Sequence, residues 1–352
     1  MKRFLICGLT LCSLFVLFLF SGCSSKPPAD GTKELNVFFW TEYIPESIIK
    51  QFEKETGIKV NFATYSSNED MMAKVKSSAE GTYDIVIPSD YAVKMMIEEG
   101  LLSEIDKNAI DNLSNIELSY LNRDFDPGNR YSIPYMAGVA AIVVNKKKIN
   151  EKITSFGQLF DAKYKNSIVA LDDSRAVIGA AANSMGYSFN PEDDAVLDAV
   201  AKKVMALKQN IKLLDSDSPK TSMLNGETSI GYMWSAEIAI CLQENGDDFE
   251  VVFPEEGCYL FLDNMSIVKG AKNKANAEKF INFVLRADIG KSILDEYPYA
   301  SPNKAAIGIV SDSYKNNPAS NIKSDIFSKG QFIKDVGSKV EKYDEIWTKF
   351  TK

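Results

Sequence analysis

Apolar and polar positions along the chain alternate in a pattern that predicts short strands followed by helices. In the first part, three apolar runs predict strands, and each is followed by a segment of helical periodicity. The predicted strands are 35–39, 59–64 and 83–88, and the predicted helices are 46–56, 68–79 and 92–99. Gly57 and Gly100 close the first and third of these helices. Strands that alternate with helices at this spacing indicate an α/β fold with a mostly parallel sheet.

The second part of the chain repeats this alternation after a long apolar segment. Residues 131–135 lead into a predicted strand over 139–144. Further strands are expected at 168–171, 211–214, 231–234, 250–253 and 264–268, with helices at 177–185, 195–209 and 275–285. The pattern predicts two α/β lobes, but it does not show where the chain crosses between them.

The first residues predict export. Met1-Lys2-Arg3 is followed by an apolar run over 4–20, which ends in the small residues Ser21-Gly22 before Cys23. The run is short, and small residues close it, which favours a cleaved signal over the alternative of a transmembrane anchor. The segment also resembles the lipobox of bacterial lipoproteins. That resemblance implies a signal peptide over 1–22, a lipid on Cys23 and a flexible tether over 23–33 that holds the protein to a membrane.

Composition and charge narrow the possible functions. The chain has 352 residues, of which 45% are hydrophobic and 25% charged, as in ordinary globular proteins, and about 330 would remain after cleavage. Loss of Lys2 and Arg3 with the signal would change the formal charge from −8 to −10. An acidic balance argues against a nucleic-acid partner and favours a cationic ligand. Histidine is absent, which excludes Ser-His-Asp and Cys-His catalysis and His-ligated zinc.

Two cysteines, Cys241 and Cys258, would remain free of the signal and the lipid. Geometry decides whether two cysteines pair, and nothing in the sequence brings these two together. We expect two isolated buried thiols, with a disulfide as the alternative.

Trp40-Thr41-Glu42-Tyr43 follows directly after the first predicted strand and precedes a helix. In open α/β sheets, ligands bind in the crevice at the carboxyl ends of the strands. Trp and Tyr offer flat apolar faces with a polar tip, so this segment is a candidate wall of a small-molecule site.

Nearly all of the chain after the signal resembles the spermidine/putrescine-binding proteins of bacterial polyamine importers. The resemblance begins at Trp40-Thr41-Glu42-Tyr43 and the segment 51–60, and it continues through matching segments in one register. These are 83–89, 131–135, 171–173, 231–234, 261–263, 282–286 and 301–306.

The resemblance implies a two-lobed periplasmic-binding-protein fold of type II, with a mostly parallel sheet flanked by helices in each lobe and the ligand in the cleft between them. Crossings near Gly138, Asp263 and Ile307 would place 34–138 plus 264–307 in the first lobe and 139–263 plus 308–352 in the second. It also implies a monomer that lies in the periplasm or on the cell surface and delivers its ligand to the membrane subunits of an ABC permease. No metal or cofactor is needed.

The chemistry of a polyamine defines what such a site must contain. Each buried ammonium requires a carboxylate and other acceptors, while the methylene chain packs against aromatic faces that also attract the cations. Placed on matching positions, the resemblance implies twelve ligand-binding residues: Trp40, Thr41, Tyr43, Ser89, Tyr91, Asp173, Ser216, Trp234, Glu237, Phe261, Asp263 and Tyr299. Asp263 is expected to pair with an ammonium. Glu42 is expected to face solvent or to cap the following helix.

Departures from the family pattern favour a short amine. Spermidine-preferring members carry a glutamate at the position of Ala176 and a glutamine at that of Ile333. Glu237 and Phe261 are similar to putrescine-preferring members instead. We therefore expect putrescine or a similar short amine first and spermidine close behind.

Capture by hinge closure, without catalysis, is the predicted mechanism. Two alternatives from other classes stay open. Carboxylates in an aromatic cleft also occur in glycoside hydrolases, and a surface lipoprotein can sense a polyamine without transporting it.

Overall fold

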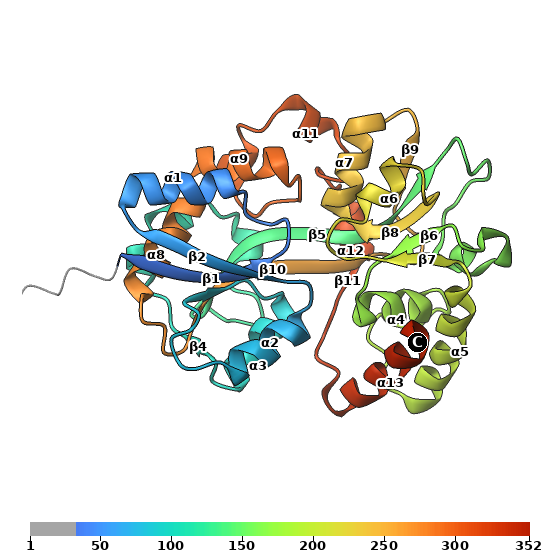
Figure 1. The fold of residues 1–352 in the computed structure, drawn as a ribbon, viewed down its shortest axis with the longest axis horizontal. Helices are drawn as coiled ribbons and strands as arrows, with labels where there is room; N and C mark the ends of the chain where they lie inside the picture. Colours follow the sequence, from blue (N-terminus) through green and yellow to red (C-terminus); the bar gives the residue numbers. More distant parts are fainter. Residues whose placement is uncertain (1–32) are drawn as a thin grey trace, which may run out of the picture. The chain divides into compact units, whose positions relative to one another are not determined.

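The structure of the protein is a computed structural model, which describes residues 33–352 (Figure 1). The predicted signal peptide, Cys23 and the tether up to residue 32 lie outside the described residues. Among residues 33–352, no helix is long and apolar enough to cross a membrane.

The strands of the described residues form one mixed sheet in the order β2-β1-β3-β10-β5-β8-β6-β7. The strands on this path are β1 Glu34–Trp40, β2 Lys59–Tyr65, β3 Ile85–Val86, β5 Ser132–Asn145, β6 Ile168–Ala170, β7 Ile211–Leu214, β8 Ile230–Trp234 and β10 Tyr259–Val268. Off the path, β4 (Leu102–Ser103) and β11 (Gln331–Phe332) pair with β10, and β9 (Phe249–Val252) pairs with β5. We call β1–β3 with their helices the β1 half, and β6–β8 with theirs the β8 half.

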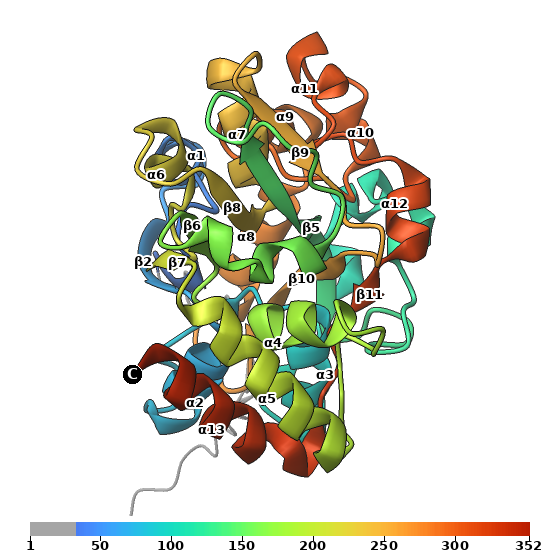
Figure 2. The ribbon, with the colours of Figure 1, turned by 90° about the vertical axis from the view of Figure 1, so that its right-hand side faces the viewer.

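Helices cover both faces of this sheet. They are α1 Glu46–Thr56, α2 Asn68–Ser77, α3 Asp90–Glu98, α4 Ser174–Asn183, α5 Asp194–Lys208, α6 Lys220–Leu224, α7 Ser235–Asn245, α8 Lys274–Val284, α9 Ala287–Glu296, α10 Lys304–Ile307, α11 Asp312–Asn316, α12 Ser324–Lys329 and α13 Val340–Thr351. In the β1 half, α1 and α9 lie on one side of the sheet and α2 and α3 on the other (Figure 1). In the β8 half, α4, α5 and α13 pack together on one side, and α6 and α7 lie on the other (Figure 2).

The predicted elements with clear periodicity are confirmed. Helix α1 begins directly after Pro45 and ends at Gly57, whose φ of 70° is a left-handed conformation that glycine adopts without steric cost. Its apolar face buries Ile48, Ile49 and Phe52. The ring of Phe52 packs edge-on against Phe280 of α8, with centroids 5.0 Å apart.

The strand predicted over 83–88 is reduced to two residues, Ile85 and Val86. At its end, the Ile87 carbonyl accepts hydrogen bonds from the Trp40 indole and the Tyr65 hydroxyl instead of a neighbouring strand. Pro88 then offers no N–H for a ladder. At this carbonyl, hydrogen bonds from two side chains therefore replace the backbone hydrogen bonds of a regular strand.

Residues 131–144 form one strand, β5, rather than a lead-in followed by a separate strand. Its fourteen residues are all buried, as expected for a strand covered on both faces. Asp263 of β10 pairs with Met136, but Asn264 pairs with Pro134, so Tyr135 is an extra residue in a β-bulge. A bulge accommodates a proline within a central strand.

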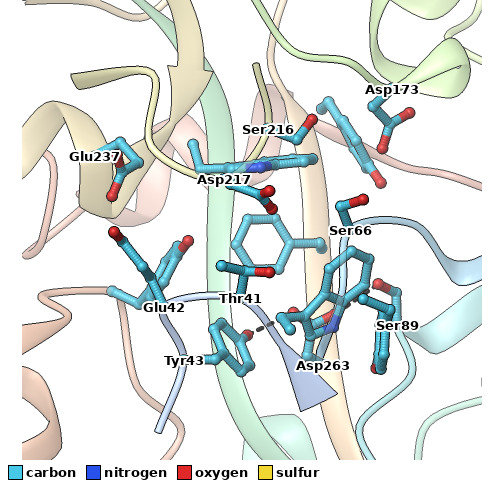
Figure 3. A pocket seen from close by; sticks show the side chains of 16 residues that line it. Thr41, Glu42, Tyr43, Ser66, Ser89, Asp173, Ser216, Asp217, Glu237 and Asp263 are labelled. Carbon is cyan, nitrogen blue, oxygen red and sulfur yellow. Dashed lines mark hydrogen bonds between the residues drawn. The ribbon is translucent and has the colours of Figure 1, made fainter. Parts of the chain in front are cut away.

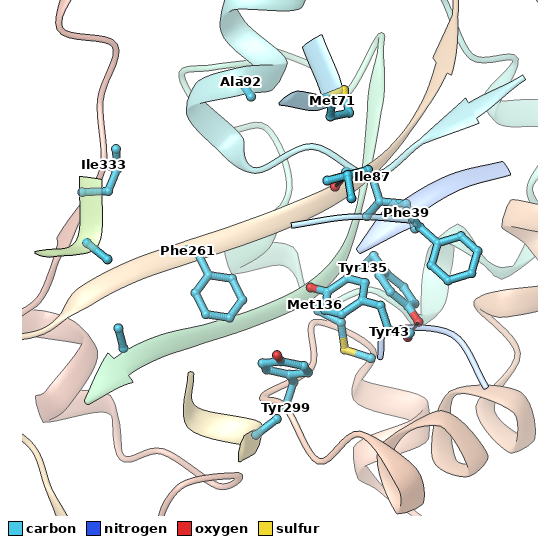
Figure 4. Close-up of a cluster of buried hydrophobic side chains, with 14 of the residues drawn as sticks. Phe39, Tyr43, Met71, Ile87, Ala92, Tyr135, Met136, Phe261, Tyr299 and Ile333 are labelled. Atoms are coloured by element: carbon cyan, nitrogen blue, oxygen red, sulfur yellow. Dashed lines mark hydrogen bonds between the residues drawn. The ribbon is translucent and has the colours of Figure 1, made fainter. Parts of the chain in front are cut away.

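The sheet is parallel within each half, as predicted, and antiparallel in its centre. β10 runs antiparallel to β3 and β5, and β5 runs antiparallel to β8. The long strands β5 and β10 join the halves, and the predicted crossings at Gly138 and Asp263 lie within them. The lobe boundaries stay a prediction. Buried aromatic side chains continue along these strands toward the candidate site (Figure 4).

Cys241 and Cys258 are buried free thiols, which confirms the preferred prediction over a disulfide. Burial raises the pKa of each thiol to about 12, so both stay protonated at neutral pH.

Candidate functional site

A pocket lies between the two halves and is lined by side chains from both (Figure 3). The β1 half contributes Trp40, Thr41, Glu42, Tyr43, Tyr65, Ser66 and Ser89. The β8 half contributes Asp173, Ser216, Asp217, Trp234 and Glu237, while Tyr259, Phe261 and Asp263 come from β10 and Tyr299 from the loop after α9. The carboxyl ends of β1 and β2 meet here because the two strands are parallel and in register, with Trp40 opposite Tyr65.

Of the twelve residues predicted for the site, all except Tyr91 line this pocket. The Tyr91 hydroxyl contacts Asn68 and donates a hydrogen bond of 3.1 Å to Glu69, and the Arg175 guanidinium lies over its ring. Tyr91 is therefore placed behind the pocket wall, in the contact between α3 and α4.

Asp263 lies at the β-bulge of the central strands, where it is 4% exposed. Its carboxylate accepts hydrogen bonds from the Ser89 hydroxyl at 2.6 Å and the Tyr43 hydroxyl at 2.5 Å. Burial raises the pKa of Asp263 to about 7, although these two hydrogen bonds lower it. Within residues 33–352, no lysine or arginine forms an ion pair with it. Asp263 is thus a buried carboxyl held in place by neutral donors only.

Aromatic rings form a continuous wall beside Asp263. Phe261 packs edge-on against Trp234 and Tyr299, with ring centroids 5.5 and 5.8 Å away, and Tyr299 packs against Tyr43 at 5.4 Å. Gly138 of β5 makes room for this wall, because a Cβ there would lie 2.5 Å from the Phe261 ring. Trp40, which also lines the pocket, is fixed by a 2.8 Å hydrogen bond from its indole to the Ile87 carbonyl.

Asp173 caps a helix and is also a candidate binding residue. Its side chain caps α4 by accepting the Ala176 N–H at 2.9 Å, and it also lines the pocket. Burial and the nearby Glu69 raise the pKa of Asp173 to about 6. Ser216 faces the same region, and its buried hydroxyl has no hydrogen-bond partner among the described residues.

Glu42 does not behave as predicted. It lines the pocket and faces Glu237 (Figure 3), and its carboxylate contacts the Lys220 ammonium of α6 at 2.5 Å. Its side chain is 35% exposed and so faces solvent only in part, and the expectation that it caps the following helix is wrong, because Pro45 is the N-cap of α1. The chain turns at Glu42 with a φ of 51°. This left-handed conformation is uncommon for a residue other than glycine, and it directs the side chain across the pocket.

Four further residues of the wall were not predicted, although the sequence holds a signal for each. Tyr65 and Ser66 end the strand parallel to β1, so they share the edge on which Trp40 lies. Tyr259 is two residues before Phe261 and so shares its face of β10. Asp217 directly follows Ser216.

The two positions that lack the polar residue of spermidine-preferring members, Ala176 and Ile333, lie outside the pocket wall. Ala176 and Ile333 are both buried, at 0% and 2% exposure, and neither lines the pocket. Glu237 and Phe261, by contrast, are both part of it.

In chemical terms, the pocket combines carboxyl groups, hydroxyls and aromatic faces. Carboxylates and hydroxyls accept hydrogen bonds from an ammonium, while ring faces attract the cation and pack against methylene groups. The arrangement suits a small organic cation.

Comparisons with known proteins agree with this interpretation. The bacterial extracellular solute-binding protein family matches residues 47–322. The chain is 39% identical to a spermidine/putrescine-binding periplasmic protein of Salmonella typhimurium, over 92% of this chain and 93% of that one. It is 30% identical to a putrescine/cadaverine-binding protein of Pseudomonas aeruginosa, over 95% and 97%.

Among solved structures, the chain is similar to a putative spermidine/putrescine ABC transporter protein from Listeria monocytogenes. The TM-score is 0.87 at 34% identity, and the match covers 91% of this chain and 99% of that one. Its fold is therefore the two-lobed type II fold of periplasmic binding proteins. The chain belongs to the bacterial extracellular solute-binding protein family.

Proposed function

We propose that this protein captures a polyamine, putrescine or spermidine, between its two halves and delivers it to an ABC-type permease. The observation that carries the proposal is Asp263, a buried carboxyl among aromatic rings that only neutral groups contact in the described residues. A buried carboxylate without a cation is costly, and an amine ligand would supply the missing charge.

The remaining residues of the pocket match the rest of such a ligand. The rings of Trp234, Phe261 and Tyr299 offer the flat walls that a methylene chain needs, and Asp173 offers a second carboxyl on another side. We propose that the predicted pocket residues form the binding site of the amine. Tyr91 would act indirectly, through Asn68 and Glu69.

The relatives support transport rather than catalysis. Those described above are named as binding proteins for spermidine, putrescine or cadaverine. The periplasmic relative also supports an extracytoplasmic location. From the sequence alone, we further propose a monomer without enzymatic activity that is anchored by a lipid on Cys23. The polyamine sensor and the glycoside hydrolase remain the competing functions. Loss of labelled-amine uptake on deletion separates transport from sensing, and an assay with chromogenic glycosides tests the hydrolase.

Calorimetric titration of the purified protein with putrescine and spermidine tests the proposal. The matched control ligand is 1,4-butanediol, which keeps the four-carbon chain and replaces the ammonium groups with neutral hydroxyls. We expect both amines to bind at micromolar or lower concentration and the diol not to bind. Failure of both amines to bind, or equal binding of the diol, would contradict the proposal.

A further inference from the structure

The Lys220 ammonium pairs with two carboxylates, Glu42 and Glu237, that line one end of the pocket. Its Nζ lies 2.5 Å from Glu42 and 3.0 Å from each carboxylate oxygen of Glu237, and it donates to the Ser218 hydroxyl at 2.9 Å. Glu42 follows β1 and Lys220 begins α6, so the contact links the two halves. Two carboxylates and a hydroxyl are the acceptors that a primary ammonium requires when it leaves water.

Lys220 remains charged in this environment. Its side chain is 15% exposed, and burial alone would lower its pKa. The carboxylates of Glu237 and Glu42 outweigh that effect and raise the pKa of Lys220 above its ordinary value. Two carboxylates of the pocket wall are therefore already paired with a protonated amine of the protein.

The backbone supports a defined role for this contact. Glu42 adopts a positive φ of 51°, and residues held in such conformations cluster at functional sites. Glu237 is 4% exposed, and its carboxylate accepts hydrogen bonds from both the ammonium and the backbone N–H of Lys220.

The other end of the pocket differs in charge. Asp263 and Asp173 both line it, and neither forms an ion pair with a lysine or arginine in residues 33–352. Glu42 and Glu237 face one another on one side of the pocket, while Asp173 lies on another side (Figure 3). Among the pocket carboxyls of the described residues, Glu42 and Glu237 thus have a cation, while Asp173, Asp217 and Asp263 form no ion pair.

We propose that Lys220 takes the place of one ammonium of the ligand and thereby sets the number of charges that the ligand carries. With Glu42 and Glu237 satisfied from within, the protein selects a diamine over a triamine. Lys220 is then a specificity-determining residue. This inference rests on the proposed function, because it presumes that an amine binds beside Asp263.

The variant Lys220→Met tests the proposal, because Met keeps an unbranched side chain that is only one atom shorter and removes the ammonium. Titration with putrescine and spermidine should show the Kd ratio shift toward spermidine by at least tenfold, or about 1.4 kcal/mol. The third ammonium of the triamine would meet the freed carboxylates. Lys220→Gln, which keeps a hydrogen-bond donor, gives the same test if the Met variant does not fold.

Lys212→Met is the matched control. Lys212 forms a 3.6 Å ion pair with Glu227, a carboxylate that does not line the pocket, so its loss should leave the ratio unchanged. An unchanged ratio in a Lys220 variant that still binds amines, or equal weakening of both amines, would overturn this inference and leave Lys220 as a tether between helices. Absence of amine binding to the unaltered protein would instead contradict the proposed function.

Discussion

Protonation of single buried carboxyl groups governs the charge of the pocket. Burial raises the pKa of Asp263 to about 7 and, together with Glu69, that of Asp173 to about 6. Below these values the groups take up protons and lose the charge that attracts an ammonium. Amine binding should therefore release protons near neutral pH.

We predict that putrescine affinity falls as the pH is lowered from 8 to 5.5. Each carboxyl with a raised pKa is ionised above that pKa and neutral below it, so binding is strongest at the alkaline end. Each group that must lose a proton costs up to about tenfold in Kd per pH unit below its pKa. Titrations in buffers of different ionisation enthalpy measure the released protons. A Kd that is constant over this range would contradict the assignment of these carboxyls.

At the scale of elements, Gly138 shows how one strand position shapes the wall. A Cβ there would lie 2.5 Å from the Phe261 ring and 2.8 Å from the Ser235 hydroxyl. We predict that Gly138→Ala displaces the ring into the pocket, weakens amine binding and destabilises the fold by about 1–3 kcal/mol, as overpacking does. Denaturant unfolding and calorimetric titration measure the two effects.

Gly157→Ala serves as the control for this change. The Cβ added at Gly157 would meet only the Ser155 hydroxyl, at 3.5 Å, which is ordinary contact. Both stability and binding should stay close to those of the unaltered protein. Normal amine binding in Gly138→Ala would show that the Phe261 ring does not need its present position.

Elements defined by local chemistry were predictable from the sequence. Helix α1 begins and ends where Pro45 and Gly57 indicate, because those residues act on their own segment. The strand over 83–88 was overestimated, because Trp40 and Tyr65 take the Ile87 carbonyl across more than twenty residues of sequence. The bulge at Tyr135 likewise depends on the register between β5 and β10.

In the site, too, features that depend on residues far apart in the sequence were harder to predict than local ones. The family resemblance predicted Asp263 and the aromatic rings as site residues, because it includes positions that are far apart in the sequence but belong to one site. Glu42 was misjudged because its partner, Lys220, is 178 residues away and no local pattern joins the two. A residue with positive φ is also hard to foresee where no glycine marks the turn.

At the scale of the whole molecule, side-chain contacts near the pocket connect the two halves. Lys220 meets Glu42 on one side, and Arg175 of α4 lies over the ring of Tyr91 of α3, 5.5 Å from its centroid. An amine that contacts both halves favours the closed arrangement by its difference in affinity for the closed and open states. Asp263, in the central strand that joins the halves, is the point on which this account depends.

Calorimetric titration of putrescine into the protein and its Asp263→Asn variant at pH 8 tests that claim most directly. Asn keeps the size of the side chain and removes the charge, so we predict a loss of affinity of at least about 100-fold, or roughly 2.8 kcal/mol, with the fold intact. Asp124→Asn, which alters an exposed carboxylate outside the pocket, should bind as the unaltered protein does. Affinity retained within about threefold in a folded Asp263→Asn variant would contradict the account.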